Sequence, residues 1–340
     1  MKTITKKSAI YRVKSLSATL LFVSAIAFCA CAQKSNNTSS PTVTNSSGND
    51  GPAVFFTTEI SPEALIQVFE ALGVEPNGRV AVKISTGESS HSNQLDPALI
   101  APLVKRVGGT IVECNTAYPL SRRARTASHL RAIEKRGYGN VDIMDSEGTM
   151  RLPVLDTTYI KYDEVGSHVA NYDFMIDLSH FKGHGMGGFG GALKNLSIGV
   201  ASRSGKFYIH SAGSTDSRWA PAEQDAFLES MATAAEAVHR YYKQDGRNIV
   251  YINVMNNLSV DCDCAGSPAT PRMKDVGILA STDPVALDKA CLDLVFGHQS
   301  TAADDARPLQ ERINRKHGTH IITHAERLGL GTSHYRLIKL

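Results

Sequence analysis

The fold class is decided by three consecutive segments: RVAVKI at 79–84, PALIAPLVKR at 97–106 and TIVEC at 110–114. The first and third are rich in β-branched residues and predict buried strands, and the middle one predicts a helix. The pair Gly108-Gly109 marks the stop of that helix. A strand–helix–strand order with short turns implies parallel pairing and a right-handed crossover. We therefore predict an α/β fold with a mostly parallel sheet flanked by helices.

The rest of the chain continues this alternation. Further strands are predicted at 53–58, 172–178 and 248–254, a helix start at Ser61-Pro62, a long amphipathic helix at 221–242 and a strand-to-helix junction at 278–288. Residues 53–340 are accordingly expected to form a single large domain, with a division into two sub-lobes left open. The segment Ser202 to Arg218 is polar and turn-rich, and we expect it to be a loop over the site.

Residues 1–32 have the features of an export signal. Basic residues precede the apolar run Leu20 to Ala32, which contains no acid and is shorter than the roughly 20 residues of a membrane span. Two processing routes stay open, cleavage after Ala32 or lipidation of Cys31 in a loose lipobox. Residues 33–52 are polar and are predicted to be a disordered linker. We expect an exported bacterial protein, periplasmic or anchored as a lipoprotein.

The charge balance changes once the signal is set aside. The chain has 36 basic and 33 acidic residues, and five of the basic ones lie in 1–32, which leaves 31 against 33. A nearly neutral body gives no electrostatic footprint for nucleic acid. Membrane association is expected only through an N-terminal lipid anchor. The four cysteines after residue 32 are too few for a disulfide scaffold.

The densest chemical stretch is HFKGHGMGGFGGALKN at 180–195, with two His, two Lys, one Asn and six Gly. It follows a predicted strand, and the amides of such a glycine-rich turn can line up on an anion. The spacing matches neither the dinucleotide-binding pattern nor a P-loop, and a plain loop remains the alternative. Proton transfer and anion stabilisation need titratable donors, which selects four candidate catalytic residues. They are Lys182, His184, Lys194 and Asn195.

Candidate substrate-binding residues come from the same turn and from neighbouring strand ends. Ligands of parallel sheets bind beyond the carboxyl ends of the strands. The predicted strands at 79–84 and 110–114 end beside polar residues, and the loop predicted over the site carries a histidine. The candidates are Lys83, Asn115, Thr116, Gly187, Gly188, Gly190, Gly191 and His210.

A second cluster, Asp261-Cys262-Asp263-Cys264, is a dense ligand set. If the backbone is extended, the two cysteines are poorly placed for an ordinary disulfide. In a turn they can chelate a soft metal such as Fe, Zn or Ni. A tetrahedral site would then need His184, His210 or Cys114 as well. Unligated thiols or an uncommon C-x-C disulfide are the open alternatives.

These motifs resemble a known family. FKGHG at 181–185 with GALKN at 191–195 is similar to the K-x-H-G … T-x-A-L-K-N signature of the DUF362 family. Agreement extends to DCDC at 261–264 and to DVGILASTDPVA at 275–286, and covers nearly everything from residue 53 onward. The family has no settled activity. Many members carry a ferredoxin-type insertion after the position of Asn195, but this sequence has no C-x-x-C-x-x-C run, so no classical ferredoxin cluster is expected.

Two function classes follow. The first is a metal- or cofactor-dependent enzyme, with redox chemistry as one option, that acts on a small anionic substrate at the strand ends. The second is a periplasmic anion-binding or accessory protein without chemistry. The enzyme requires the 182–195 turn and the 261–264 loop to fold into one pocket, whereas the binding protein would capture its anion with the glycine turn and the Arg cluster at 122–125. No G-x-S-x-G elbow supports a serine hydrolase.

Overall fold

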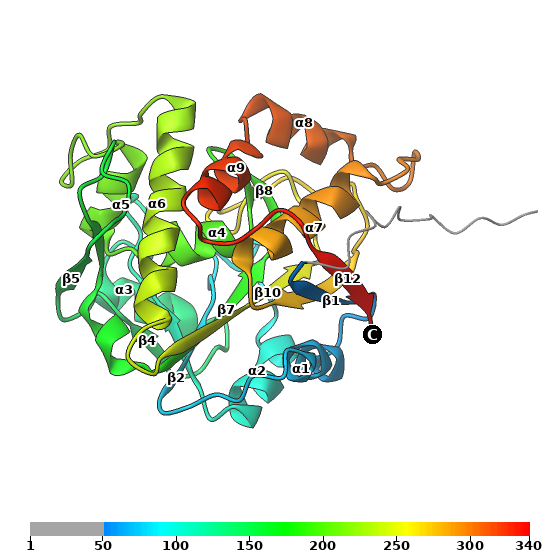
Figure 1. Cartoon of the computed structure of the whole chain (residues 1–340), viewed down its shortest axis with the longest axis horizontal. Helices are drawn as coiled ribbons and strands as arrows, with labels where there is room; N and C mark the ends of the chain where they lie inside the picture. Colours follow the sequence, from blue (N-terminus) through cyan, green and yellow to red (C-terminus); the bar gives the residue numbers. More distant parts are fainter. Residues whose placement is uncertain (1–50) are drawn as a thin grey trace, which may run out of the picture. The chain divides into compact units, whose positions relative to one another are not determined.

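An eight-stranded sheet forms the centre of the computed structural model, which describes residues 51–340 (Figure 1). Its strands are β1 (Ala53–Thr57), β2 (Val80–Lys83), β3 (Thr110–Glu113), β4 (Val141–Ile143), β7 (Phe174–His180), β10 (Asn248–Met255), β11 (Gly277–Ser281) and β12 (Arg336–Lys339). They lie in the order β12-β1-β11-β10-β7-β2-β3-β4. Only β11 is antiparallel to its neighbours, β1 and β10, and every other pairing is parallel. The predicted mostly parallel sheet is confirmed.

Helices cover both faces of this sheet (Figure 1). One face packs against α1 (Pro62–Ala71), α2 (Pro97–Arg106) and α3 (Thr126–Glu134). The other packs against α4 (Ala192–Lys194), α5 (Arg203–His210), α6 (Gln224–Tyr242), α7 (Pro284–Phe296), α8 (Arg307–Arg315) and α9 (His320–Arg327). In β7, Phe174, Ile176 and Leu178 face the first core while Met175 faces the second, as the two-residue period of a strand requires.

Two helix starts form for the reasons that the sequence indicates. Ser61 accepts a hydrogen bond from the Ala64 amide at 3.1 Å, with Pro62 in the first turn of α1. Asp283 accepts bonds from the Val285 and Ala286 amides, both at 2.9 Å, at the start of α7. Asp283 is therefore the capping residue of the predicted strand-to-helix junction at 278–288.

Shorter elements shape the edge of the sheet. The glycine-rich stretch forms a hairpin of β8 (Lys182–His184) and β9 (Gly188–Gly190), followed by α4 and a π-helical turn, Asn195–Gly199. A second small sheet pairs β5 (Thr149–Leu152) with β6 (Asp163–Gly166), and a 3₁₀ helix spans Ser167–Asn171. The glycine cluster is thus an ordered hairpin that leads into a helix, not a plain loop.

The expectation of a loop over the site at 202–218 is wrong for its first half. Residues Arg203–His210 form α5, and Ser202 caps it by accepting a bond from the Gly205 amide at 3.0 Å. The polar composition misled the prediction, because Lys206 and His210 are buried by tertiary packing. A polar sequence with one good cap therefore folds as a helix once its polar groups find partners.

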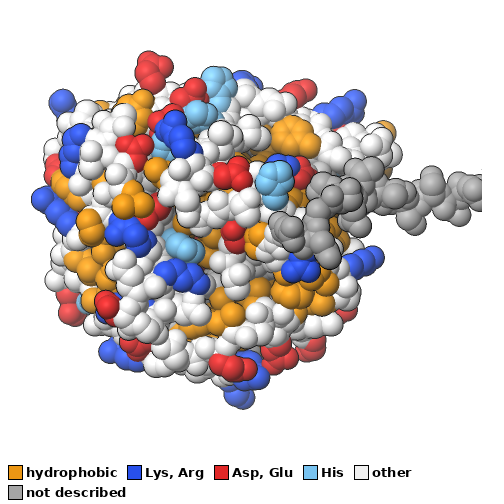
Figure 2. Space-filling view, in the orientation of Figure 1, with side chains coloured by type: hydrophobic (Ala, Val, Ile, Leu, Met, Phe, Trp, Pro, Cys, Tyr) orange, Lys and Arg blue, Asp and Glu red, His pale blue; other side chains and the backbone are white. Residues whose placement is uncertain are grey.

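The predicted signal peptide (1–32) and almost all of the predicted linker (33–52) lie outside the described residues. Residues 51–340 belong to one compact unit, so the two sub-lobes are not seen. In this described part, no helix combines the length and the apolar character needed to cross a membrane. Basic and acidic side chains are interspersed over the face shown in Figure 2.

Candidate functional site

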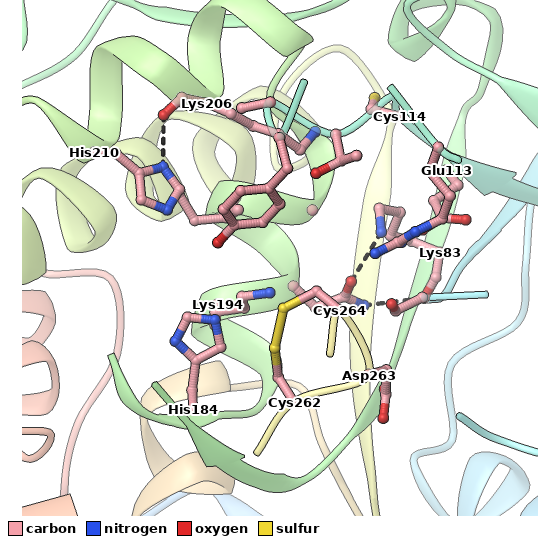
Figure 3. A pocket seen from close by; sticks show the side chains of 18 of the residues that line it. Lys83, Glu113, Cys114, His184, Lys194, Lys206, His210, Cys262, Asp263 and Cys264 are labelled. Carbon is pink, nitrogen blue, oxygen red and sulfur yellow. Dashed lines mark hydrogen bonds and ion pairs between the residues drawn. A yellow bond between two sulfur atoms is a disulfide. The ribbon is translucent and has the colours of Figure 1, made fainter. Parts of the chain in front are cut away.

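A small pocket of about 60 Å³ lies beyond the carboxyl ends of β2, β3 and β7 (Figure 3). That volume has room for about four water molecules or a small ligand. Most of the pocket's polar groups are cationic or imidazole side chains. They are Lys83, Arg123, Lys182, Lys194, Lys206, His184 and His210, with Ser85, Glu113, Thr116, Tyr118, Asn195 and Cys262 to Cys264 completing the polar wall.

The 182–195 segment and the 261–264 loop converge on this pocket, as the sequence predicts. The Gly183 amide donates to Ser259 O at 2.8 Å, so the β8 backbone runs directly against the loop. A Cβ atom on Gly183 would lie 2.4 Å from Val260 O, a distance that only glycine avoids. The convergence therefore depends on one glycine at the crossing point.

Lys182 is paired with a carboxylate of the protein. Its Nζ atom donates to Asp263 Oδ2 and to His180 O, both at 2.7 Å. His180 Nδ1 contacts Asp263 Oδ1 at 2.9 Å. Burial alone would raise the pKa of Asp263, but the charges of His180 and Lys182 hold that pKa well below its usual range. The three side chains form an ion-pair network that uses two of the three N–H donors of Lys182.

Both aspartates of the predicted metal set are already bonded to other groups of the protein. Asp263 is held by the network just described, and Asp261 accepts from Arg312 at 3.2 Å and from the Ala269 amide at 3.0 Å. Both carboxylates fix the loop in place. A metal role for them remains a prediction that this geometry does not favour.

Cys262 and Cys264 are joined by a disulfide, the third alternative that the sequence leaves open. The two sulfurs and a ring nitrogen of His184 all lie within 4.8 Å of one another. As a disulfide, the sulfurs are not thiolates and are poor metal ligands. The group can hold a metal ion only after reduction.

His184 is a neutral hydrogen-bond donor toward the pocket. Its Nδ1 accepts the amides of Gly187 at 2.8 Å and of Met186 at 3.2 Å, so the proton of the neutral ring sits on Nε2. Burial, followed by the charges of Lys194, His210 and Lys182, keeps the pKa of His184 well below its usual value. The ring thus offers an N–H group and no positive charge.

Within residues 51–340, the ammonium group of Lys194 makes neither a hydrogen bond nor an ion pair. Its side chain runs toward the disulfide beside His184 (Figure 3). Burial, then repulsion by Lys182, Arg123 and Lys83, lowers the pKa of Lys194 to about 7. Lys194 differs from the other pocket cations because its ammonium group, when protonated, has neither a counter-ion nor a bonded oxygen, and this makes it a candidate anion-binding group.

Asn195 bridges two buried charged residues beneath the pocket. Its side chain donates to Asp177 Oδ1 and to Lys83 O, and its carbonyl oxygen accepts from Lys83 Nζ at 2.8 Å. Burial lowers the pKa of Lys83 and raises that of Asp177. Asn195 therefore couples the end of β2 to β7, and its predicted catalytic role becomes one of positioning in this geometry.

His210 faces the pocket in the opposite tautomer from His184. Its Nδ1 donates to Lys206 O at 2.6 Å, which leaves Nε2 unprotonated in the neutral ring. Burial lowers the pKa of His210 to about 4. The ring is clamped between Phe227 and Trp219, with centroids 4.9 Å away on each side. One histidine of the pocket thus presents an N–H and the other a lone pair.

Several predicted binding residues lie elsewhere. Asn115 turns away from the pocket, bonding Asp145 and Thr126, while Thr116 does line it. Gly188 packs against Gly318, and Gly191 against the Asp288 carboxylate. These glycines permit close packing of the hairpin and α4, and no amide cradle opens into the pocket.

Five polar residues that line the pocket are absent from the predicted site residues. They are Ser85, Glu113, Tyr118, Arg123 and Lys206. Tyr118 follows β3 by a few residues, so the rule that ligands bind beyond strand ends was enough to find it. Lys206 precedes His210 by one helical turn, a signal that requires the helix to be recognised first.

With the site described, the chain can be compared with known proteins. A sequence model for a domain of unknown function, DUF362, matches residues 80–293, which is more than half of the chain. The chain belongs to the DUF362 family. The resemblance found in the 181–195 and 261–286 motifs is thereby confirmed. Among curated proteins, the comparison finds no match.

Solved structures show a distant likeness to this DUF362 protein. One is a lactate racemase apoprotein from Thermoanaerobacterium thermosaccharolyticum, with 15% identity and a TM-score of 0.42, covering 69% of this chain and 55% of that one. Another is a structural-genomics target from Thermotoga maritima, with 13% identity and a TM-score of 0.39, covering 68% and 57%. This chain spans little more than half the length of either, and the likeness assigns no activity.

Proposed function

We propose that this DUF362 protein is an exported enzyme, linked to a metal, a cofactor or redox chemistry, that acts on a small anionic substrate. The observation that carries the proposal is the Lys194 ammonium, which faces the pocket without a counter-ion. Other pocket cations are already bonded, Lys182 to Asp263 and Arg123 to Glu113 at 2.6 Å. An incoming carboxylate or phosphate would supply the charge that Lys194 lacks.

The two histidines supply the matching proton chemistry. His184 Nε2–H donates to a substrate oxygen held by Lys194, while His210 Nε2 is available to accept a proton. In this proposal His210 is the candidate general base, and the neutral His184 ring stabilises the substrate oxygen as a hydrogen-bond donor. A developing negative charge would be stabilised by Lys194 in a site largely shielded from water.

Metal dependence applies to the reduced protein only. His184, Cys262 and Cys264 then offer one nitrogen and two sulfurs, a set suited to zinc or another borderline-soft ion, which would act as a Lewis acid. Ligation through His184 Nε2 would move the ring proton to Nδ1 and break the bonds from the Met186 and Gly187 amides. That cost makes metal binding conditional on a change in the hairpin.

The second candidate is a non-catalytic periplasmic anion-binding or accessory protein. The small volume of the pocket favours it, because about 60 Å³ admits only a compact ligand. Lys194 alone suffices for capture, and neither histidine is then needed for chemistry.

Calorimetric titration with acetate, oxalate and inorganic phosphate tests the anion site. We expect Lys194→Gln to lose binding by at least about tenfold, because one close charge is worth more than 1.4 kcal/mol in a shielded site. Lys289→Gln is the matched control, since Lys289 is on the surface and pairs with Asp293. Equal affinities in both variants would contradict the proposal.

Metal analysis of anaerobically purified protein whose Cys262–Cys264 disulfide has been reduced separates the two candidates. Stoichiometric Fe, Zn or Ni that is lost in Cys262→Ser favours the enzyme. An absence of metal, together with thermal stabilisation by anions, favours the binding protein.

A further inference from the structure

The Cys262–Cys264 disulfide lies between two adjoining cavities. The inner one is the basic pocket, and the outer one is a more open recess of about 270 Å³. Four residues line both, namely Tyr118, His184, Cys262 and Cys264. Cys264 is half-buried, whereas Cys262 is only 7% exposed. A small molecule can therefore reach the sulfur of Cys264 from the open side.

The loop that carries the disulfide is held by other bonds. Asp263, between the two cysteines, is fixed by His180 and Lys182, and its carbonyl accepts from the Glu88 amide at 2.8 Å. Asp261 is fixed by Arg312. A disulfide across one intervening residue removes little chain entropy from the unfolded state. The disulfide therefore contributes little to the stability of a loop that other bonds already hold in place.

Hydrogen-bond donors and charge stand beside the sulfurs. His184 has a ring nitrogen within 4.8 Å of both, and Lys194 approaches from the same side (Figure 3). A thiolate released there meets an N–H group and an ammonium, the surroundings that stabilise thiolates in thiol–disulfide enzymes.

From these observations we propose that the Cys262–Cys264 disulfide is a redox-active centre that oxidises small thiols carrying a negative charge. The negative charge assigned to the thiol substrate rests on the proposed function of Lys194. The redox activity of the disulfide is inferred independently, from the placement of the two sulfurs. The substrate is a low-molecular-weight thiol with a carboxylate or similar group.

The exchange balances in two steps. A substrate thiolate attacks Cys264 Sγ, the S–S bond breaks, and Cys262 leaves as a thiolate beside Lys194 and His184. A second substrate thiolate attacks the substrate sulfur of the mixed disulfide and releases the Cys264 thiolate. Two thiols are oxidised to one disulfide, the protein disulfide is reduced, and the two protons lost by the thiols end on the two cysteines.

The test measures reduction of the disulfide in the native full chain. Three probes are compared at equal thiolate concentration: 3-mercaptopropionate, 2-mercaptoethanol and cysteamine. Alkylation and mass spectrometry of the Cys262–Cys264 peptide give the rates. We expect 3-mercaptopropionate to react on the order of tenfold faster than cysteamine. Lys194→Gln should bring that ratio close to one, Lys194→Arg should restore it, and Lys289→Gln should leave it unchanged.

Two results would overturn the proposal, and they are distinguishable. A disulfide that stays inert to all three thiols until the protein is unfolded rules out the redox centre. Equal rates for the three thiols in the native protein rule out the anionic class, and with it the role given to Lys194. Circular dichroism of each variant shows that the rates compare folded proteins.

Discussion

The two ends of the glycine-rich segment each carry a lysine, and the two lysines have opposite surroundings. Lys182, at the start of β8, lies against Asp263 and His180 in an ion-pair network. Lys194, at the end of α4, lies in the same pocket with no partner among the described residues. Both side chains pass beside Gly190, where a Cβ atom would lie 3.9 Å from Lys194 Cδ and 4.0 Å from Lys182 Cε.

The difference lies in the loop that each lysine meets. Asp263 is the carboxylate of the 261–264 loop that bonds to the hairpin, and it forms an ion pair with Lys182. Lys194 is left beside the disulfide, where the neighbouring groups are neutral sulfurs and a neutral imidazole. A paired lysine stabilises the fold, whereas an unpaired one stores repulsion that a ligand can relieve.

The largest effect expected from this comparison is on stability. Lys182→Met would leave the buried Asp263 carboxylate with His180 alone and cost about 3 kcal/mol, as the loss of one partner from a buried ion pair does. Lys194→Met removes a charge that the folded state destabilises, so the free energy of unfolding should not fall and should rise. Urea unfolding of both variants measures the difference, and equal costs would show that the two lysines are equivalent.

A smaller loss of stability is expected from a substitution at Gly183, where the β8–β9 hairpin crosses the loop that carries the disulfide. Gly183→Ala would place a Cβ atom 2.4 Å from Val260 O and 2.5 Å from Val260 C, both backbone atoms that cannot rotate away. We expect a loss of about 1–3 kcal/mol, typical of overpacking. Gly185→Ala is the matched control, because nothing lies within 4 Å of its Cβ position. A Gly183 variant as stable as the control would mean that the crossing is not tightly constrained.

Much of the fold that places these two lysines can be predicted from the sequence. The alternation of strand and helix patterns predicts the parallel sheet, and Ser61 and Asp283 mark helix starts through local capping. Because parallel strands end at one edge, the residues after β2, β3 and β7 are expected to share a site. The family motifs pointed to the same residues.

The bonding partners of those residues cannot be predicted from local sequence patterns. Lys182 and Asp263 are 81 positions apart, so no local pattern says which lysine is paired. Cys262 and Cys264 form a disulfide because the loop curls, and the backbone path of a loop is not fixed by spacing alone. The helix α5 escapes notice because its polar side chains are buried by packing and bond to nearby backbone carbonyls, as His210 Nδ1 does to Lys206 O one helical turn earlier.

The smallest expected effect is the pH dependence of anion affinity, which follows from the protonation of Lys194. Burial and the charges of Lys182, Arg123 and Lys83 lower the pKa of Lys194 to about 7 in the free pocket. Only the protonated form attracts an anion, so affinity is complete below pH 7 and falls as pH rises above it. Between pH 6 and pH 8 the affinity for acetate should drop about tenfold.

The two pocket histidines do not blur this titration, since burial lowers the pKa of His210 to about 4 and keeps that of His184 well below its usual value. Burial lowers the pKa of Lys83 to about 8, so Lys83 does begin to titrate in the same window. Lys194→Arg isolates the contribution of Lys194, because a guanidinium stays charged throughout and should flatten the profile up to about pH 7.5. An acetate affinity that is constant from pH 6 to 8 in the unmodified chain would mean that Lys194 does not hold the anion, and the contrast between the two lysines would then be structural only.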